Sequence, residues 1–218
     1  MKKLSVFLFI LLFSVPVFSQ FIKFGIKAGA ESNKTPEYNI SFAPSIFSNY
    51  IITPQNNTSW GFHGGIFTRI KIQMLYIQPE VIFASNSYDY EVANIYHWSS
   101  AIYPKPDIKS QKFNRLSVPI LVGMEFGPVR INAGPVAAIQ IGSPKALIDD
   151  PNFKKMYKDA VWGFQAGIGF DILETLTLDF RYAGSLGERY GNEVTIGNQN
   201  YKLDHGQKSF LVSIGLMF

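Results

Sequence analysis

The chain of 218 residues contains no cysteine. Disulfides, thiolate metal sites, a thiol nucleophile and the lipid attachment of a lipoprotein are therefore excluded. Charged residues are also scarce, at 17%, whereas aromatic residues reach 15%. This composition is apolar for a soluble domain and ordinary for strands that face lipid between aromatic girdles.

Long apolar runs are absent except for one at the start of the chain. After two lysines, residues 4–18 are predominantly apolar over about the length of a signal-peptide core. We expect residues 1–19 to be a signal peptide cleaved before Gln20, with an uncleaved anchor helix as the alternative. Residues 20–218 then form one domain. No later stretch approaches the roughly 18 apolar residues that indicate a transmembrane helix.

The charge of the mature chain is close to balanced. The whole sequence has 20 basic and 16 acidic residues, and removing Lys2 and Lys3 with the leader leaves 18 basic residues. A net charge near +2 gives no reason to expect binding to nucleic acid.

Eight later segments alternate between apolar and polar residues, which is the period of a β-strand with two unlike faces. The clearest is the last segment, where serines and a glycine lie opposite an apolar row. That row consists of Phe210, Val212, Ile214, Leu216 and Phe218. The predicted strands span residues 21–29, 58–70, 74–85, 112–125, 129–142, 159–172, 175–184 and 208–218.

The connections between these strands alternate in length, long and then short, along the whole chain. The long ones are residues 30–57, 86–111, 143–158 and 185–207. Inside them, residues 38–47 are expected either to extend a strand or to form a small hairpin, and a helical turn is expected over 152–157. Short turns at one end and long loops at the other are typical of a transmembrane barrel. The sequence therefore predicts an all-β fold: an eight-stranded antiparallel up-and-down transmembrane β-barrel with short periplasmic turns and long extracellular loops.

The closing strand and several motifs add a resemblance to a known family. The motifs, in chain order, are FGIKAG at 24–29, GFHGG at 61–65, IQPE at 77–80, LSVPI at 116–120, INAGP at 131–135 and Arg181-Tyr182. The chain resembles the outer-membrane β-barrel domain family of Bacteroidetes, which includes PorT-like proteins. The resemblance implies location in the cell outer membrane. It also implies that the terminal Phe218 is the signal read by the barrel assembly machinery.

Three prolines lie inside predicted strands. Pro79, Pro119 and Pro135 each lack the N–H that a sheet ladder uses, and proline is normally confined to strand edges or bulges. A closed barrel has no edges, so we expect bulges or strand irregularity at these positions.

Polar side chains alternate with the apolar row and are expected to face the inside of the barrel. An eight-stranded barrel is only wide enough for side chains to fill it. We therefore expect a packed polar plug, with a narrow ion pathway or a small-ligand pocket as the alternative. Glu80 with Arg181, and Asp179 with Arg69 or Lys27, are candidate ion pairs. The expected interior set is Lys23, Lys27, Arg69, Gln78, Glu80, Glu125, Arg130, Gln165, Asp179 and Arg181.

The three histidines give no spacing that indicates a metal site. His63 is expected inside the barrel, and His97 and His205 are expected in loops. Some eight-stranded barrels are lipid-modifying enzymes, but the sequence does not pair His63 with a serine and a carboxylate. We therefore expect no enzymatic activity, no catalytic residue, no metal and no cofactor.

Tyrosine and tryptophan recur near strand ends, which indicates an interfacial belt. We expect this belt for the aromatics within strands. For those on the loop 86–111 both a belt and a partner-binding surface stay open. The residues concerned are Tyr50, Trp60, Tyr76, Tyr88, Tyr90, Tyr96, Trp98, Tyr103, Trp162, Tyr182 and Tyr201.

The leading hypothesis is a non-enzymatic barrel whose long loops bind something outside the cell or support the envelope or secretion. Its expected partners are outer-membrane lipid, the assembly machinery and an extracellular or secretion-system protein. The alternatives are a narrow small-solute channel, a lipid enzyme at the rim and a soluble periplasmic barrel that binds a lipophile inside.

Overall fold

A computed structural model describes most of the chain after residue 20. The described residues are 21–34, 40–45, 48–54, 58–96, 107–142, 154–156, 160–186, 192–196, 199–203 and 208–218. The predicted signal peptide and its cleavage site lie outside them, as do His97 and His205. Within these ranges no helix is long and apolar enough to cross a membrane.

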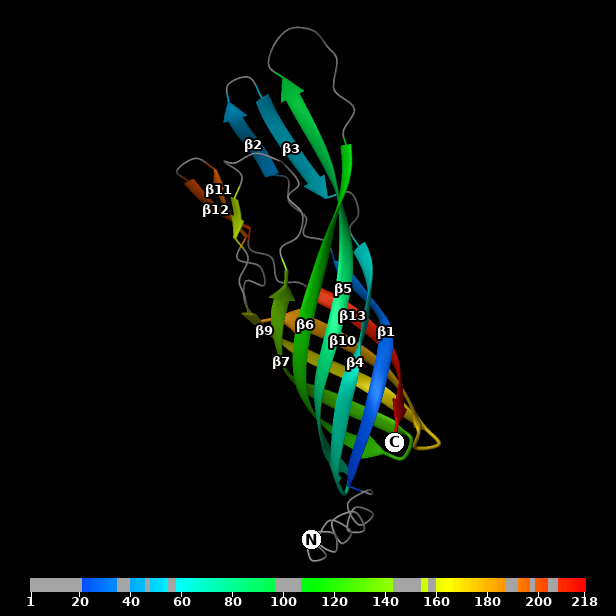
Figure 1. Ribbon diagram of the computed structural model, residues 1–218. Coiled ribbons are helices and arrows are strands. Elements are labelled where there is room, and N and C mark those ends of the chain that lie inside the picture. The colour runs from blue at the N-terminus through cyan, green and yellow to red at the C-terminus, as the bar shows by residue number, and fades with distance from the viewer. Residues whose placement is uncertain are drawn as a thin grey trace, which may run out of the picture.

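Eight antiparallel strands form a closed ring (Figure 1). The first and last are paired from Gly25 opposite Met217 to Asn33 opposite Ser209, and a further pairing of the third and fourth strands of the ring completes it. The predicted eight-stranded up-and-down barrel is confirmed. Its strands are β1 (Ile22–Lys34), β4 (Thr58–Ile72), β5 (Leu75–Tyr96), β6 (Asp107–Phe126), β7 (Val129–Ile141), β9 (Ala160–Ile172), β10 (Leu176–Ser185) and β13 (Lys208–Met217).

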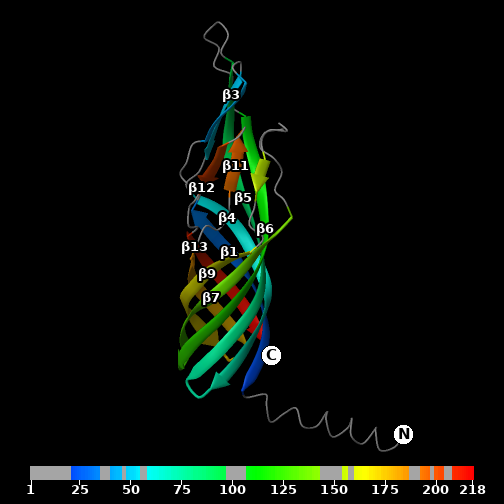
Figure 2. The ribbon, with the colours of Figure 1, turned by 90° about the vertical axis from the view of Figure 1, so that its left-hand side faces the viewer.

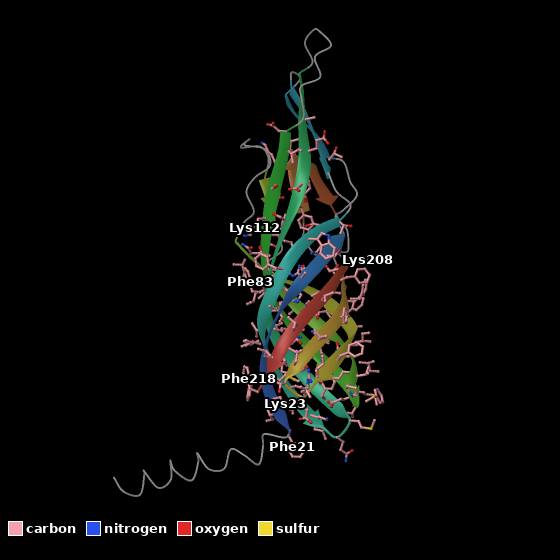
Figure 3. All side chains as sticks on the ribbon, turned by 90° about the vertical axis from the view of Figure 1, so that its right-hand side faces the viewer. Phe21, Lys23, Phe83, Lys112, Lys208 and Phe218 are labelled. Carbon is pink, nitrogen blue, oxygen red and sulfur yellow. The ribbon has the colours of Figure 1, made fainter. Side chains whose placement is uncertain are left out.

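The two faces of each barrel strand differ in the way that the period-two pattern predicts. In β13 every second residue is exposed, from Lys208 to Leu216, and the residues between them are buried. Apolar side chains project from the outside of the barrel, Phe83 and Phe218 among them (Figure 3). The interior is polar, so the alternative of a barrel that binds a lipophile inside is wrong.

The short turns and the C-terminus lie at the lower end of the barrel in Figure 1. All three short turns use the left-handed backbone region, which matches the twist of tight hairpins. Gln73 has a φ of 56°, Gly127 has a φ of 60°, and Leu173 and Glu174 have φ values of 53° and 57°. The last strand closes here on the first, since Phe24 and Phe218 exchange two backbone hydrogen bonds of 3.1 and 2.9 Å.

At the opposite end β5 and β6 continue far beyond the predicted bounds, and Val92 pairs with Asp107 near the tip. Most of the loop expected over 86–111 is therefore two strand arms, and that expectation is wrong. Tyr88, Tyr90 and Val92 are buried and alternate with acidic residues, which is a strand pattern. The polar composition of this stretch led to the prediction of a loop.

Two shorter strands, β2 and β3, join the arms of β5 and β6 to make a sheet above the barrel (Figure 2). We call this sheet of β2, β3 and the two arms the blade. The hairpin expected near 38–47 is present as β2 (Ile40–Ser45) and β3 (Ser48–Pro54), and β3 pairs with the β5 arm. A separate small sheet contains β8 (Lys154–Met156), β11 (Asn192–Ile196) and β12 (Gln199–Leu203). The helical turn expected over 152–157 is wrong, because β8 pairs with β11, a distant partner that the local sequence does not show.

The strand prolines interrupt the ladder without shifting it. Pairing of β5 with β6 stops after Pro79 opposite Ile120 and resumes at Ile82 opposite Ser117 in the same register. The pairing of β6 with β7 skips two positions beyond Pro119 in the same manner. The expected strand irregularity is therefore confirmed as interrupted pairing at Pro79 and Pro119, whereas the unchanged register shows that these interruptions are not bulges. A missing N–H removes one rung, and the paired residues on both sides hold the alignment.

Candidate functional site

Four charged side chains form a ring across the middle of the barrel, which we call the charge ring: Lys27, Glu80, Asp179 and Arg181. Each acid contacts both bases, at 2.9 Å for Lys27 to Glu80 and for Arg181 to Glu80. The Asp179 carboxylate lies 2.8 Å from Lys27 and 3.0 Å from Arg181. Burying these charges is tolerable because every one is paired on two sides. Two of the pairs that the sequence suggested, Glu80 with Arg181 and Asp179 with Lys27, are thus present.

A second cluster lies below the charge ring and shares Asp179 with it. Arg130 contacts Asp179 at 3.1 Å and Asp171 at 2.9 Å. Arg69 contacts Asp171 at 2.7 Å and donates a 2.7 Å hydrogen bond to Gln78. The alternative pairing of Asp179 with Arg69 is therefore not the one found. Asp171, which the sequence analysis did not single out, takes that place.

Tyr76 lies in this lower cluster rather than in an interfacial belt. Its side chain is buried, and its hydroxyl accepts hydrogen bonds from Arg130 and Asn132. The guanidinium groups of Arg69 and Arg130 lie 5.3 and 5.8 Å from the centre of its ring, within cation–π distance. The alternation of side chains along β5 places Tyr76 on the inward face. At this position the strand geometry prevails over the tendency of tyrosine to lie at the membrane interface.

Two members of the expected interior set lie at the rim of the short-turn end. Lys23 contacts Glu174 at 3.0 Å, and Lys71 contacts Glu125 at 2.7 Å. Lys23 and Glu125 are only partly buried there. The hydrogen bond from Lys23 lowers the pKa of the Glu174 carboxyl, which lies in the turn beyond the strands.

A third cluster lies above the charge ring. Glu31 contacts Arg115 at 2.5 Å and accepts hydrogen bonds of 2.8 and 2.6 Å from Asn33 and Asn86. Sequence reasoning missed this cluster because it ended the first strand at residue 29. Continuing the period of two for four more residues would have placed Glu31 and Asn33 on the inward face.

His63 lies between the charge ring and the upper cluster. Its Nε2 is 2.7 Å from the Ser213 hydroxyl, a partner that the sequence did not suggest. The contact crosses β1 at Gly29, which is opposite both residues in the sheet register. A Cβ on Gly29 would lie 2.0 Å from the Val212 carbonyl oxygen and 2.9 Å from His63 Cε1. Because Gly29 has no side chain, His63 from β4 and Ser213 from β13 can contact each other across β1.

The chemistry that these residues offer is limited. His63 Nδ1 has no hydrogen-bond partner among the described residues, so no carboxylate orients the imidazole as a catalytic triad requires. In the same part of the chain, no group of three or more histidine, aspartate or glutamate side chains is arranged to hold a metal ion. The tenth residue of the expected set, Gln165, is buried on β9 beside a small cavity.

Gly169 provides a test of how closely the side chains pack around the contact between Arg130 and Asp179. It lies opposite both Arg130 and Asp179, and an added Cβ would approach Arg130 Nη2 at 2.5 Å and Asp179 Oδ1 at 2.7 Å. Gly169→Ala should therefore lower the free energy of unfolding in lipid vesicles by about 1–3 kcal/mol through overpacking. Gly64→Ala is the matched control, since its Cβ would meet no atom closer than 3.4 Å. Equal stability of the two variants would contradict close packing at Gly169.

Comparison with known proteins is consistent with this architecture. Residues 18–189 match the family described as outer membrane protein beta-barrel domain. No curated protein matches the sequence.

Among solved structures, the chain is similar to Ail, the attachment invasion locus protein of Yersinia pestis, with 10% identity, a TM-score of 0.49 and coverage of 91% of this chain and 99% of that one. Neisserial surface protein A has 14% identity, a TM-score of 0.42 and coverage of 89% and 97%. OprG from Pseudomonas aeruginosa has 10% identity, a TM-score of 0.42 and coverage of 90% and 95%. The family match spans most of the sequence and agrees with the closed eight-stranded ring, so the chain belongs to the outer-membrane protein β-barrel domain family.

Proposed function

We propose that this outer-membrane protein is a closed, non-enzymatic barrel that anchors the blade outside the cell. The observation that carries the proposal is the charge ring. Lys27 comes from β1, Glu80 from β5, and Asp179 and Arg181 from β10, and their side chains are at most 4% exposed. The interior of an eight-stranded barrel is only wide enough for side chains to fill it. Ion pairs between distant strands therefore block the path through the barrel.

The same geometry argues against the alternative functions. A solute channel would need the ring to open, which separates four buried charges at once. A lipid enzyme would need its nucleophile at the rim, whereas Ser213 and His63 are buried inside. The proposed absence of catalysis rests on this burial and on the unpartnered Nδ1 of His63.

The blade is the part that we propose for binding. The β5 arm from Ser87 to Tyr96 rises roughly 30 Å at about 3.3 Å per residue. A tilted strand needs only about 9–11 residues to cross the hydrocarbon, so both arms extend well past the lipid. The resemblance to PorT-like proteins of Bacteroidetes makes an extracellular or secretion-system protein the class of partner that we propose.

Conductance measurements in planar bilayers test the closed barrel. The wild-type chain should show no unitary current steps. A variant in which an Asn-Gly turn replaces residues 88–111 should be equally silent, because Ser87 and Lys112 are paired and the charge ring lies below them. Regular steps from the wild type would favour the channel. Steps from the shortened variant alone would show that the blade, and not the interior, closes the barrel.

The absence of cysteine allows a direct test of orientation. Ile108 is 61% exposed on the β6 arm, and Glu174 is exposed in a short turn at the other end. A membrane-impermeant maleimide should label Ile108→Cys in intact cells and should label Glu174→Cys only after the outer membrane is permeabilised. The reverse pattern would mean that the blade lies in the periplasm.

The assembly machinery remains a proposed partner that would recognise Phe218. This side chain is 74% exposed, while its backbone pairs with Phe24. Phe218→Ala keeps the backbone pairing, so refolding in detergent should be unchanged. In cells, the amount of heat-modifiable barrel in the outer membrane should fall several-fold. Phe21→Ala, an exposed aromatic at the same end, is the control. Equal amounts from both variants would remove the proposed role of Phe218.

A further inference from the structure

We propose that the outer face of the barrel binds a phosphorylated lipid, with its phosphate at Lys208 and its acyl chains on the aromatic side chains below. Lys208 is the first residue of β13, and its side chain is exposed on the row that faces lipid. The strand runs from Lys208 at the long-loop end to Phe218 near the short turns (Figure 3). The site therefore lies on the lipid-facing surface, apart from the interior clusters.

The height of Lys208 on the barrel matches the level of lipid headgroups. The chain advances ten residues from Lys208 to Phe218, which corresponds to about 33 Å of strand at about 3.3 Å per residue. With a strand tilt of about 40°, this length spans about 25 Å along the membrane normal, the height of the apolar band of an outer-membrane barrel. The ammonium group of Lys208 therefore lies where one leaflet carries its phosphates.

The charge of Lys208 is not balanced by the protein. At the short-turn end, Lys23 and Lys71 each contact a carboxylate, at 3.0 and 2.7 Å. None of the described carboxylates lies within ion-pair distance of Lys208. The outward positions of β9, β10 and β13 contain no acid, because Asp171 and Asp179 belong to the interior clusters. A lipid phosphate is the anion that the membrane supplies at this level, and lysine binds phosphate as a point charge.

Three aromatic side chains form a surface directly below Lys208, which we call the aromatic shelf: Phe210 on β13, Tyr182 on β10 and Phe164 on β9. The ring centres of Tyr182 and Phe210 are 5.3 Å apart, and those of Phe164 and Tyr182 are 6.1 Å apart. Gly184 is opposite both Lys208 and Phe164 in the sheet register, and a Cβ on Gly184 would lie 2.7 Å from the Phe164 ring. The shelf is therefore continuous across three strands, with the ammonium group at its upper edge.

The shelf and the lysine together select a lipid over free phosphate. An exposed ammonium group alone is screened by salt and holds a free anion weakly. Acyl chains on the shelf keep the attached phosphate beside Lys208, which raises its effective concentration there. Assigning the lipid to the outer leaflet rests on the proposed orientation of the blade, whereas binding itself does not. The experiments below therefore fail independently of the conductance and labelling tests.

Tryptophan fluorescence provides the measurement, because Trp162 and Trp60 are exposed on the lipid face on either side of the shelf. Trp162 precedes Phe164 by two residues, and Trp60 is opposite Ser32, which is itself opposite Phe210. In phosphatidylcholine vesicles, brominated phosphatidic acid should bind about fivefold more tightly than brominated phosphatidylcholine, as measured by quenching. Equal binding of the two lipids would overturn the proposal.

Inorganic phosphate distinguishes a lipid site from a site for the free anion. Millimolar phosphate at constant ionic strength should leave quenching by brominated phosphatidic acid unchanged, since it gains nothing from the shelf. Displacement of the lipid by inorganic phosphate would overturn the proposal in favour of a free-anion site.

A matched pair of variants tests the location. Lys208→Gln removes the charge from an exposed side chain, so the preference for phosphatidic acid should fall to the level of phosphatidylcholine. Lys112→Gln is the control: Lys112 is an exposed lysine on β6 at the same end, opposite Ser87 and one step from the Asp89–Ser110 pair. It should keep the wild-type preference. An unchanged preference in Lys208→Gln, or an equal loss in both variants, would overturn the proposed site.

Discussion

Asp179→Asn should lower the free energy of unfolding by about 3–5 kcal/mol, the cost of removing one partner from a buried ion network. Asp179 contacts Lys27, Arg130 and Arg181 and is only 1% exposed. The amide keeps the shape of the side chain but leaves three buried cations with one fewer negative charge. Denaturant unfolding in lipid vesicles measures the difference.

The control for this substitution is Glu174→Gln, which removes a carboxylate from an exposed ion pair at the rim. Solvent already screens that pair, so its loss should leave the unfolding curve nearly unchanged. Combining Asp179→Asn with Gly169→Ala should give less than the sum of the two single effects, because Gly169 lies against the Arg130–Asp179 contact. A loss of less than about 1 kcal/mol for Asp179→Asn would mean that water reaches the network.

Ile214→Arg should lower the free energy of unfolding by about 2–4 kcal/mol, the cost of a charge on the lipid face at the middle of the bilayer. Ile214 lies halfway between the exposed Phe210 and Phe218, on the outer face of β13, and is 52% exposed. An arginine at this position cannot reach the interior because Ser213 and Gly215 occupy the inward face. The same vesicle measurement applies.

Depth provides the control for this second substitution. Phe126→Arg introduces the same side chain on an exposed residue at the end of β6, where the strand turns. The cost should fall to about 0–1 kcal/mol near the interface. Equal costs at both positions would mean that Ile214 does not face hydrocarbon, and the placement of the apolar surface in lipid would then be wrong.

Much of the barrel follows from local pattern. A strand turns its side chains alternately to two faces, so an apolar row and a polar row in one segment specify the outside and the inside together. The positions of Tyr76, Gln78 and Glu80 were therefore predictable from their spacing. The two arms above the barrel carry the same period. They were missed because tyrosine, serine and asparagine in that stretch are also typical of loops.

Glycine illustrates the limit of such reasoning. Inward glycines are visible in the sequence, and Gly29 and Gly169 each occupy an inward position. Their purpose is to leave room for side chains from the two flanking strands to meet, as His63 meets Ser213 across Gly29. Which residues meet depends on two separate alignments, one with each neighbour. The sequence of a single strand does not specify its alignment with either neighbouring strand.

The sequence by itself determined the eight barrel strands, their order, the short turns and which face of each is polar, because alternation and turn chemistry are properties of neighbouring residues. Only the tertiary structure decided which interior charges are partners. Arg69 meets Asp171 and not Asp179, and Asp179 instead holds Lys27, Arg130 and Arg181. The physical reason is the stagger of the closed ring. Sliding one strand by two residues keeps every face correct and changes every contact across the interior.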